Sequence, residues 1–298
     1  MNKQPLHPQG PSLSRIIAGA WRWNQLNVHQ LNALINQAID MGITTFDHAD
    51  IYGDYGNESA FGEALKLSPG LQSKLQIVTK CGIKLLSAAK PAHSIKHYDT
   101  SFDHIVTSAE NSIRQLCVEK IDLLLLHRPD PLMDVDKVAE AFTQLKEQGK
   151  VLHFGVSNFT PAQFDLLQGA LPFPLVTNQI ELSLFHHQPI FNGTIDHLYK
   201  HRVAPMAWSP LGGGKPFVDG HQVGERVQKL ATALQQKYQA TLPQLLLGWL
   251  LAHPSNVFPV AGTSQASRLK EAADAMHVKL ERQDWFEMLR WVTGTDVP

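Results

Sequence analysis

The sequence predicts a single-domain α/β fold, a closed (β/α)8 TIM barrel, and three observations lead to this prediction. Short apolar runs alternate with stretches of helical periodicity along nearly the whole chain. Almost every run is apolar without alternation, as is typical of parallel strands covered on both faces. Eight such strand and helix units account for a chain of 298 residues. A doubly wound open sheet is the alternative fold.

Each predicted strand is a short apolar run that ends in a polar or small residue. These runs are 15–20, 43–48, 76–81, 122–127, 153–158, 176–181, 204–209 and 257–262. The helical patterns between them span 28–42, 58–65, 102–117, 135–150, 160–171, 188–202 and 223–240, with a last helix at 284–292. Pro161 is typical of a helix start, and Gly42 and Gly149 are typical of helix ends.

Two connections are longer than the repeating unit requires. Residues 82–101 follow the third strand as a polar segment, which we expect to form a flap over the C-terminal end of the sheet. Residues 211–217 and the helix after them lengthen the connection between the seventh and eighth strands. Long loops in a compact domain are more often functional than idle. The residues before Arg15 are expected to form a short N-terminal hairpin or cap at the barrel bottom, without a catalytic part.

Composition limits the classes of function. Lys and Arg number 26 and Asp and Glu 27, so the formal net charge is -1 and no field of one sign indicates nucleic acid or an anionic membrane as a partner. The 15 histidines lack metal-ligand spacing such as HExxH, so no metal is expected. Cys81 and Cys117 are too few for a disulfide framework and suit a reducing compartment. With no signal peptide or membrane span visible, we expect one cytoplasmic domain over residues 1–298 without an obligate protein partner.

Four polar residues, Asp47, Tyr52, Lys80 and His127, each lie at or just past the end of a predicted strand. The C-terminal strand ends of a parallel barrel house its chemistry, so these side chains are expected to converge. Taken singly, each has a simpler interpretation: a turn residue, a rim aromatic, a solvated charge and a satisfied histidine. Four such residues in successive units are harder to assign to packing.

A carboxylate, an ammonium, a phenol and an imidazole together can transfer a proton. The reference pKa of tyrosine is about 10, too high for an acid near neutrality. We expect Lys80, held charged by Asp47, to lower the pKa of Tyr52, and His127 to hold a carbonyl oxygen where the tyrosine proton points. This set predicts the chemistry of carbonyl reduction.

A nucleotide would have to be bound by a route other than the Rossmann fingerprint. No GxGxxG sequence follows the first strand. The triple glycine Gly212–Gly214 is either a flexible loop or a phosphate contact.

The chain resembles the aldo-keto reductase family from Gly19 to about residue 270. TTFDHADIYG is similar to the family's Asp and Tyr motif, VTKCG to its Lys motif and DLLLLHRPD to its His motif. GVSNF, NQIELS, WSPLGGG and VAGTSQASRLKE are similar to its cofactor motifs and follow in the expected order. The resemblance implies a barrel enzyme that uses NADPH, less often NADH, to reduce aldehydes or ketones.

Carried over by position, the resemblance implies that Tyr52 is the proton donor and that Asp47, Lys80 and His127 complete a catalytic tetrad. The implied nicotinamide contacts are Ser157, Asn158, Gln179 and, stacked on the ring where the family usually has tyrosine or phenylalanine, Trp208. The implied contacts of the pyrophosphate are Ser209, Leu211 and Gly212. The motif implied for the adenosine 2′-phosphate holds Gly262, Thr263, Ser264 and Arg268.

Two positions depart from the family pattern. Gly262 stands where many members have lysine, and Ala272 stands where they have asparagine. Arg268 is then the main group that would discriminate NADP(H), because a planar guanidinium suits a phosphate. NADPH is favoured on this ground, with some use of NADH conceivable.

The sequence indicates less about the substrate than about the reaction or the cofactor. Trp21, Trp23, Tyr55 and the segment 84–97 follow strands one to three, so they are candidates for the pocket wall, although each could equally be rim packing. An apolar aromatic wall with a few polar groups fits a small carbonyl compound. Because no long tail follows the last predicted helix, we expect an open site and broad specificity.

Three other functions stay open. One is a redox-sensing regulatory subunit like the potassium-channel β-subunits of this family, although no added domain is visible. Another is a metal-dependent barrel hydrolase with a cation on Asp47, His48, Asp50 and His127, which leaves Tyr52 and Lys80 without a role. The third is a catalytically dead barrel kept for binding, which requires a broken tetrad.

Overall fold

Eight parallel strands close into a barrel in the computed structural model, which describes residues 3–297 of the chain. Around the barrel the strands are β3 (Ile17–Gly19), β4 (Thr45–Asp47), β5 (Gln76–Cys81), β8 (Ile121–Leu126), β9 (Val151–Ser157), β10 (Leu175–Glu181), β11 (Met206–Trp208) and β12 (Phe258–Ala261), which returns to β3. The predicted (β/α)8 barrel is confirmed. Residues 1, 2 and 298 of the expected domain lie outside the described residues.

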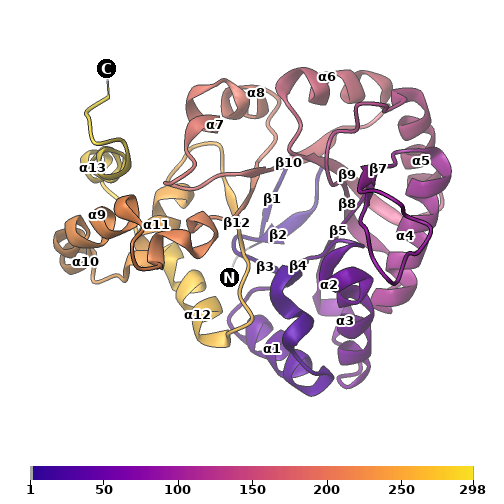
Figure 1. The fold of residues 1–298 in the computed structure, drawn as a ribbon, viewed down its shortest axis with the longest axis horizontal. Helices are drawn as coiled ribbons and strands as arrows, with labels where there is room; N and C mark the ends of the chain where they lie inside the picture. The colour runs from indigo at the N-terminus through magenta and orange to yellow at the C-terminus, as the bar shows by residue number, and fades with distance from the viewer. Residues whose placement is uncertain (1–2, 298) are drawn as a thin grey trace.

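Helices surround the strands on the outside of the barrel (Figure 1). Those of the repeating units are α1 (Val28–Asp40), α3 (Asn57–Lys66), α4 (Phe102–Leu116), α5 (Val135–Glu147), α6 (Pro161–Ala170), α8 (Thr194–Lys200), α11 (Leu242–Leu251) and α12 (Ala266–Asp274). Shorter or added elements are the 3-10 helices η1 (Ala20–Gln25) and η3 (Gly212–Phe217) and the helices α2 (Tyr52–Tyr55), α7 (Gln188–Phe191), α9 (Gln222–Leu230), α10 (Thr232–Tyr238) and α13 (Arg282–Thr293).

Three helix predictions need correction. The stretch 188–202 is two helices, because Gly193 adopts a left-handed φ of 85° between α7 and α8. The stretch 223–240 is divided at Ala231 into α9 and α10. Helix α11 was missed because its sequence, LPQLLLGWLL, is apolar on nearly all sides and has no amphipathic period. Its start is nonetheless encoded, since the Thr241 side chain accepts a hydrogen bond from the Gln244 amide.

The N-terminal hairpin closes the end of the barrel opposite the strand C-termini. Strands β1 (Lys3–Pro5) and β2 (Ser12–Ser14) pair antiparallel, as the predicted cap requires. Leu6 and Leu13 are buried and pack with Ile17 and Phe258, the first residues of β3 and β12. The hairpin therefore fills the bottom of the barrel with apolar side chains and leaves the opposite end for polar ones.

Alternation along β5 separates the barrel interior from the helical layer. Val78 packs in the interior cluster, whereas Ile77 and Cys81 pack in clusters shared with the surrounding helices. Lys80 has the parity of Val78 and Thr79 the parity of Cys81, since successive side chains of a strand point to opposite faces. The same strand therefore supplies polar groups both to the barrel mouth and to the layer behind it.

The predicted flap after β5 contains a small hairpin of its own. Strands β6 (Ile83–Lys84) and β7 (His97–Tyr98) pair antiparallel, and the loop between them returns over residues 85–96. The Tyr55 hydroxyl accepts a hydrogen bond from the Leu85 amide at 2.8 Å, so α2 holds the start of this loop.

Over the described part of the chain, none of the helices is both long enough and apolar enough to cross a membrane.

Candidate active site

The four predicted catalytic residues meet at the C-terminal end of the barrel. Asp47 is the last residue of β4, Lys80 lies one residue before the end of β5, and His127 directly follows β8. Tyr52 opens α2, the short helix after β4. Parallel pairing places Asp47 opposite Val78 and Lys80 opposite Leu125, so these strand ends are adjacent.

Lys80 is the centre of the group and is fully buried. Its Nζ donates to Asp47 Oδ2 at 2.7 Å, to Tyr52 Oη at 3.0 Å and to the carbonyl oxygen of His48 at 2.7 Å. The three donors of an ammonium are therefore all used. The imidazole of His127 lies edge-on to the Tyr52 ring, with 5.8 Å between ring centroids.

A chain of hydrogen bonds joins this group to the residues implied for the nicotinamide. The Gln179 amide donates to the second oxygen of Asp47 at 2.8 Å. The Ser157 hydroxyl donates to the backbone carbonyl oxygen of Gln179 at 2.8 Å, and Asn158 Nδ2 donates to that hydroxyl at 2.8 Å. Asn158 Oδ1 in turn accepts from Trp208 Nε1 at 2.9 Å, which fixes the half-buried indole at the mouth. Three neighbouring strands, β9, β10 and β11, thus contribute to one network.

The expected lowering of the Tyr52 pKa is wrong in its net direction. Burial raises the pKa of the phenol, and the Asp47 carboxylate acts the same way, while the Lys80 charge lowers it by less than these effects combined. The phenol therefore stays protonated at neutral pH. Sequence reasoning counted the charged neighbours of Tyr52 but not its burial, since a strand-end position does not reveal how much water reaches the hydroxyl.

Lys80 and His127 keep defined charge states. Burial lowers the pKa of Lys80, but Asp47 and Tyr52 together outweigh it and raise the pKa, so the ammonium stays charged. Burial, then the Lys80 charge, hold the pKa of His127 well below its usual range, so the imidazole is neutral. Its Nδ1 is buried without a partner among the described residues. A neutral imidazole can donate one N–H to a carbonyl oxygen.

The geometry does not support the metal-hydrolase alternative. His48 is buried with its ring packed 4.5 Å from Phe61 and 6.3 Å from Trp23, measured between centroids. Burial lowers its pKa to about 3. In residues 3–297 the carboxylate and imidazole groups around Asp47 do not form a set with metal-ligand spacing. The Asp47 carboxylate is instead neutralised by Lys80.

The loop after β11 is a turn built on several residues of positive φ. Ser209 and Gly212–Gly214 all have positive φ, and a Cβ on Gly212 would lie 2.9 Å from the Pro216 ring. Leu211 is partly buried and packs its side chain against two of the hydrophobic clusters. Arg22 in η1 donates to the Gly213 carbonyl oxygen at 3.2 Å, which ties the first loop of the barrel to this one.

The turn between β12 and α12 holds the residues implied for the 2′-phosphate. Thr263 Oγ1 accepts from the Gln265 amide at 3.1 Å, and Ser264 lies in the same turn. The helix α12 begins at Ala266, its N-cap residue Gln265 makes no side-chain capping hydrogen bond, and Arg268 is exposed in its first turn. An uncapped helix start beside a guanidinium is suited to an anion. Gly262 is exposed, and a Cβ there would meet no atom within 4 Å.

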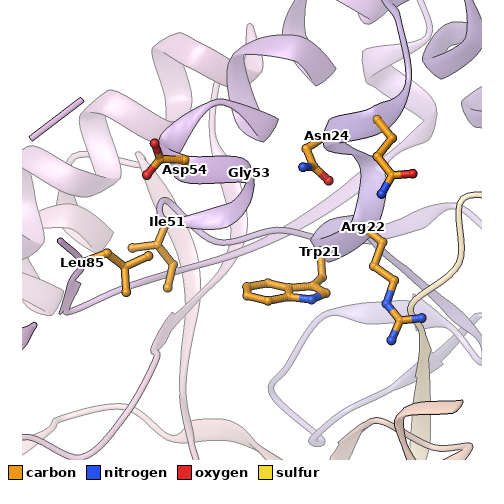
Figure 2. Close-up of a pocket in the computed structure, with 8 residues that line it drawn as sticks. Trp21, Arg22, Asn24, Ile51, Gly53, Asp54 and Leu85 are labelled. Atoms are coloured by element: carbon orange, nitrogen blue, oxygen red, sulfur yellow. The ribbon is translucent and has the colours of Figure 1, made fainter. Parts of the chain in front are cut away.

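Of the three aromatic residues expected in the substrate pocket, only Trp21 lines the pocket between η1, α2 and the start of the flap, whose lining does not include Tyr52. This pocket holds about 320 Å³ and is lined by Trp21, Arg22, Asn24, Gln25, Ile51, Gly53, Asp54 and Leu85. Figure 2 shows the Trp21 indole extending from η1 toward Ile51 and the Arg22 side chain extending away from it. The indole is 56% exposed and meets the Tyr52 ring edge-on at 4.9 Å.

Trp23 and Tyr55 have structural contacts instead. Trp23 is buried, stacks on Phe61 and donates from Nε1 to the Thr263 carbonyl oxygen at 2.8 Å, so it belongs to the core. Tyr55 holds the flap through its bond with Leu85. Of the expected aromatic wall, Trp21 lines this pocket whereas Trp23 and Tyr55 pack elsewhere, because sequence position alone does not show which way each side chain points.

Sequence reasoning missed two groups near the site. Arg128 directly follows His127 and places its guanidinium 5.7 Å from the centre of the Trp208 ring, a cation–π contact. Behind the tetrad lie the buried Glu58 and the half-buried Asp50, which the sequence indicated only as a metal ligand; burial raises the pKa of each to about 7. The signal that the sequence offered was Asp50, an acidic residue three positions after Asp47, but how far Asp50 is buried depends on the fold and is not visible in the sequence.

Comparisons with known proteins agree with the fold and identify the family. The family model described as Aldo/keto reductase family matches residues 15–290. Oxidoreductase YdhF of Escherichia coli (strain K12) is 48% identical over 294 residues, which cover 98% of this chain and 97% of that protein. A 6-dehydroglucose reductase of Agrobacterium fabrum is 43% identical over 288 residues, which cover 96% of each chain. The aldo/keto reductase from Klebsiella pneumoniae, solved in complex with NADP and acetate, has a TM-score of 0.79 at 23% identity, covering 97% of this chain and 95% of that one. The protein belongs to the aldo/keto reductase family.

Proposed function

We propose that the protein is an NADPH-dependent reductase that converts an aldehyde or ketone to an alcohol, with Tyr52 as the proton donor. One observation carries the proposal: a protonated phenol lies 3.0 Å from a buried ammonium that is itself paired with a carboxylate, at the open end of the barrel. The family membership and the NADP complex of the Klebsiella pneumoniae relative support the cofactor.

The residues at the mouth fit a nicotinamide dinucleotide. Trp208 offers a half-exposed ring whose orientation is fixed by Asn158. The glycine turn after β11 lets backbone approach a pyrophosphate closely, since a Cβ would block it. The uncapped start of α12 and the exposed Arg268 fit a phosphate on the adenosine ribose. When bound, NADPH supplies the hydride.

The tetrad supplies the proton and holds the charge that its transfer leaves. Tyr52 gives its proton to the carbonyl oxygen as that oxygen gains negative charge. The phenolate that remains lies beside the Lys80 ammonium, whose attraction is strong because the pair is nearly removed from water. Asp47 keeps Lys80 charged and aimed, and Gln179 holds Asp47 from the other side.

His127 positions the substrate in this proposal. Its imidazole is neutral, so it can donate an N–H to the carbonyl oxygen without competing as an acid. The ring lies against Tyr52, so both donors reach the same oxygen. Two donors converging on one oxygen stabilise the charge that develops there.

We propose a polyhydroxylated carbonyl compound, such as an oxidised sugar, as the substrate class. Four of the eight residues that line the pocket between η1 and α2 carry polar or charged side chains: Arg22, Asn24, Gln25 and Asp54. The exposed face of the Trp21 indole offers an apolar platform among them. The Agrobacterium fabrum relative is named a 6-dehydroglucose reductase, which is consistent with this class.

We propose that the protein works in the cytoplasm and without an obligate protein partner. Cys81 and Cys117 are both free thiols, which suits the cytoplasm. The tetrad and the proposed cofactor residues all come from one chain, so we propose that no other protein is needed for the reaction.

The test is the loss of NADPH absorbance with pairs of aldehydes that differ only in their hydroxyl groups, such as glyceraldehyde and propanal. We expect NADPH to be consumed with both, a higher kcat/KM for the hydroxylated member, and no effect of a metal chelator. No consumption with any aldehyde or ketone would refute the reductase. Equal or reversed preference within each pair would refute only the substrate class.

A further inference from the structure

A second cluster of reactive side chains lies on the outer surface of the barrel, away from the tetrad. Asp165 in α6 meets His197 in α8 and His201 at the end of α8. In the described part of the chain, these three are the only residues that the spacing of their donor atoms marks as a possible metal site. Figure 1 shows α6 and α8 on the outside of the barrel.

We propose that Asp165, His197 and His201 bind a zinc ion that links α6 to α8. The three donor atoms all lie within 4.8 Å of one another. Asp165 Oδ1 is 2.7 Å from His197 Nε2 and 3.5 Å from His201 Nε2. Two imidazoles and one carboxylate form a donor set that zinc commonly uses.

These distances are close to those of a bound ion. Donors about 2.1 Å from a tetrahedral zinc lie roughly 3.4 Å apart. The Asp165 to His201 distance already has this value, and the Asp165 to His197 distance has to open by roughly 0.7 Å. A single rotation of the exposed Asp165 side chain can supply that movement, because it is 54% exposed.

The histidine rings are held in place before any ion arrives. His197 and His201 are one helical turn apart, so both project from one face of the helix. The His197 ring packs edge-on against the buried Phe164 at 5.3 Å, and the His201 ring lies 6.2 Å from the same phenyl group. The side chain of His197 is only 12% exposed. An ordered donor pair loses less entropy on binding than a mobile one.

The sequence did not predict a metal site, because the histidine spacing was read without its third ligand. Asp165 lies 32 residues before His197 and reaches it only through the packing of α6 on α8. Three protein ligands leave a fourth tetrahedral position for water or for a donor from outside. The ion would join the two helices that flank β10, which carries Gln179.

The simplest alternative is an ordinary ion pair between Asp165 and His197 without any metal affinity. The two interpretations differ in their response to zinc, and this response does not require the reductase to be active. Isothermal titration of the metal-free protein with zinc ions, with thermal unfolding measured in parallel, separates them.

We expect one zinc per chain and a melting temperature that rises with zinc concentration. His201→Gln should lower the affinity by about tenfold or more, since even partners behind the ligands of metal sites cost that much. Asp165→Asn should do the same. His93→Gln is the matched control, because His93 also contacts a second histidine four residues away, His97, and should leave zinc binding unchanged.

Binding that is absent, or that is equal in His201→Gln and the unaltered protein, would overturn the proposal. So would a loss of binding in His93→Gln. Magnesium, a hard cation that prefers oxygen ligands, should not raise the melting temperature in the same range. NADPH-dependent activity of His201→Gln should equal that of the unaltered protein, because none of the three ligands contacts the tetrad.

Discussion

Two polar clusters lie on opposite sides of β5, and their ionisable groups differ in charge state at neutral pH. The paired cluster, at the barrel mouth, consists of Asp47, Tyr52, Lys80 and Gln179. The acid cluster, in the layer between β5 and the helices α3 and α4, consists of Asp50, Glu58, Thr79, Ser108 and Ser112.

In the paired cluster the buried ammonium has a carboxylate partner, whereas the two carboxyl groups of the acid cluster accept their side-chain hydrogen bonds from the hydroxyls of Thr79, Ser108 and Ser112. Burial raises the pKa of Glu58 to about 7, and burial and then the charge of Glu58 raise the pKa of Asp50 to about 7. Lys80 is kept charged by its partners. The comparison teaches that, of these two clusters, the ammonium that touches a carboxylate stays charged at neutral pH, whereas the carboxyl groups without a touching opposite charge are shifted toward their protonated forms.

The largest expected effect comes from removing the proton donor of the paired cluster. Tyr52→Phe keeps the ring and removes the hydroxyl, so kcat for carbonyl reduction should fall by roughly 10²–10⁴, the usual contribution of general acid catalysis. NADPH affinity should be unchanged, as measured by fluorescence titration. Tyr55→Phe, which removes a phenol that bonds only to the Leu85 amide, is the control and should keep nearly full activity. Near-normal turnover in Tyr52→Phe would remove that residue from the mechanism.

The next largest effect concerns the pH dependence of stability, which should change when the ionisable Glu58 of the acid cluster is replaced. The folded pKa of Glu58 is above its ordinary value of 4.5, so the native state binds more protons than the unfolded state, and stability falls as pH rises from about 5 to about 8. The loss is on the order of 3 kcal/mol for a rise to about 7. Glu58→Gln cannot ionise, so its free energy of unfolding should depend less on pH than that of the unaltered protein.

Urea unfolding at pH 5.5 and pH 8 measures this difference. Glu63→Gln, on the exposed side of the same helix, is the control and should follow the unaltered protein. Parallel stability curves for Glu58→Gln and the unaltered protein would mean that Glu58 is ionised at little cost, and the contrast between the two clusters would then be lost.

The smallest effect concerns a charge outside both clusters. Arg268 is exposed, so its contact with a 2′-phosphate is screened by water and should contribute about 1 kcal/mol. Arg268→Ala should weaken NADPH several-fold and NADH hardly at all. Gly262→Lys adds a cation where a side chain meets no neighbour, and it should tighten NADPH. Lys270→Ala, in the same helix but paired with Asp274, should change neither affinity. Equal losses for both dinucleotides in Arg268→Ala would show that Arg268 does not contact the phosphate.

Asp47, Tyr52 and Lys80 of the paired cluster were predictable from sequence because each lies at or just past a strand end, and strand ends of a closed parallel barrel converge. The acid cluster was not, since the meeting of Glu58 with Thr79 depends on how α3 packs against β5. The same limit applies to Gln179 and Asp47, which are 132 positions apart. The direction of the Tyr52 pKa was mispredicted because it depends on burial, a property of the folded site rather than of the list of its neighbours.

The measurement that tests the central claim most directly is the pH profile of kcat/KM for oxidation of a simple alcohol by NADP, in which Tyr52 acts as the base. The claim is that Lys80 lowers the proton affinity of a phenol that burial would otherwise raise further. In Lys80→Met the rise of kcat/KM with pH should therefore move to higher pH, and Tyr52→Phe should show no such rise. If the rise stays at the same pH in Lys80→Met while only the plateau falls, Lys80 acts by position alone and the account of the proton donor is contradicted.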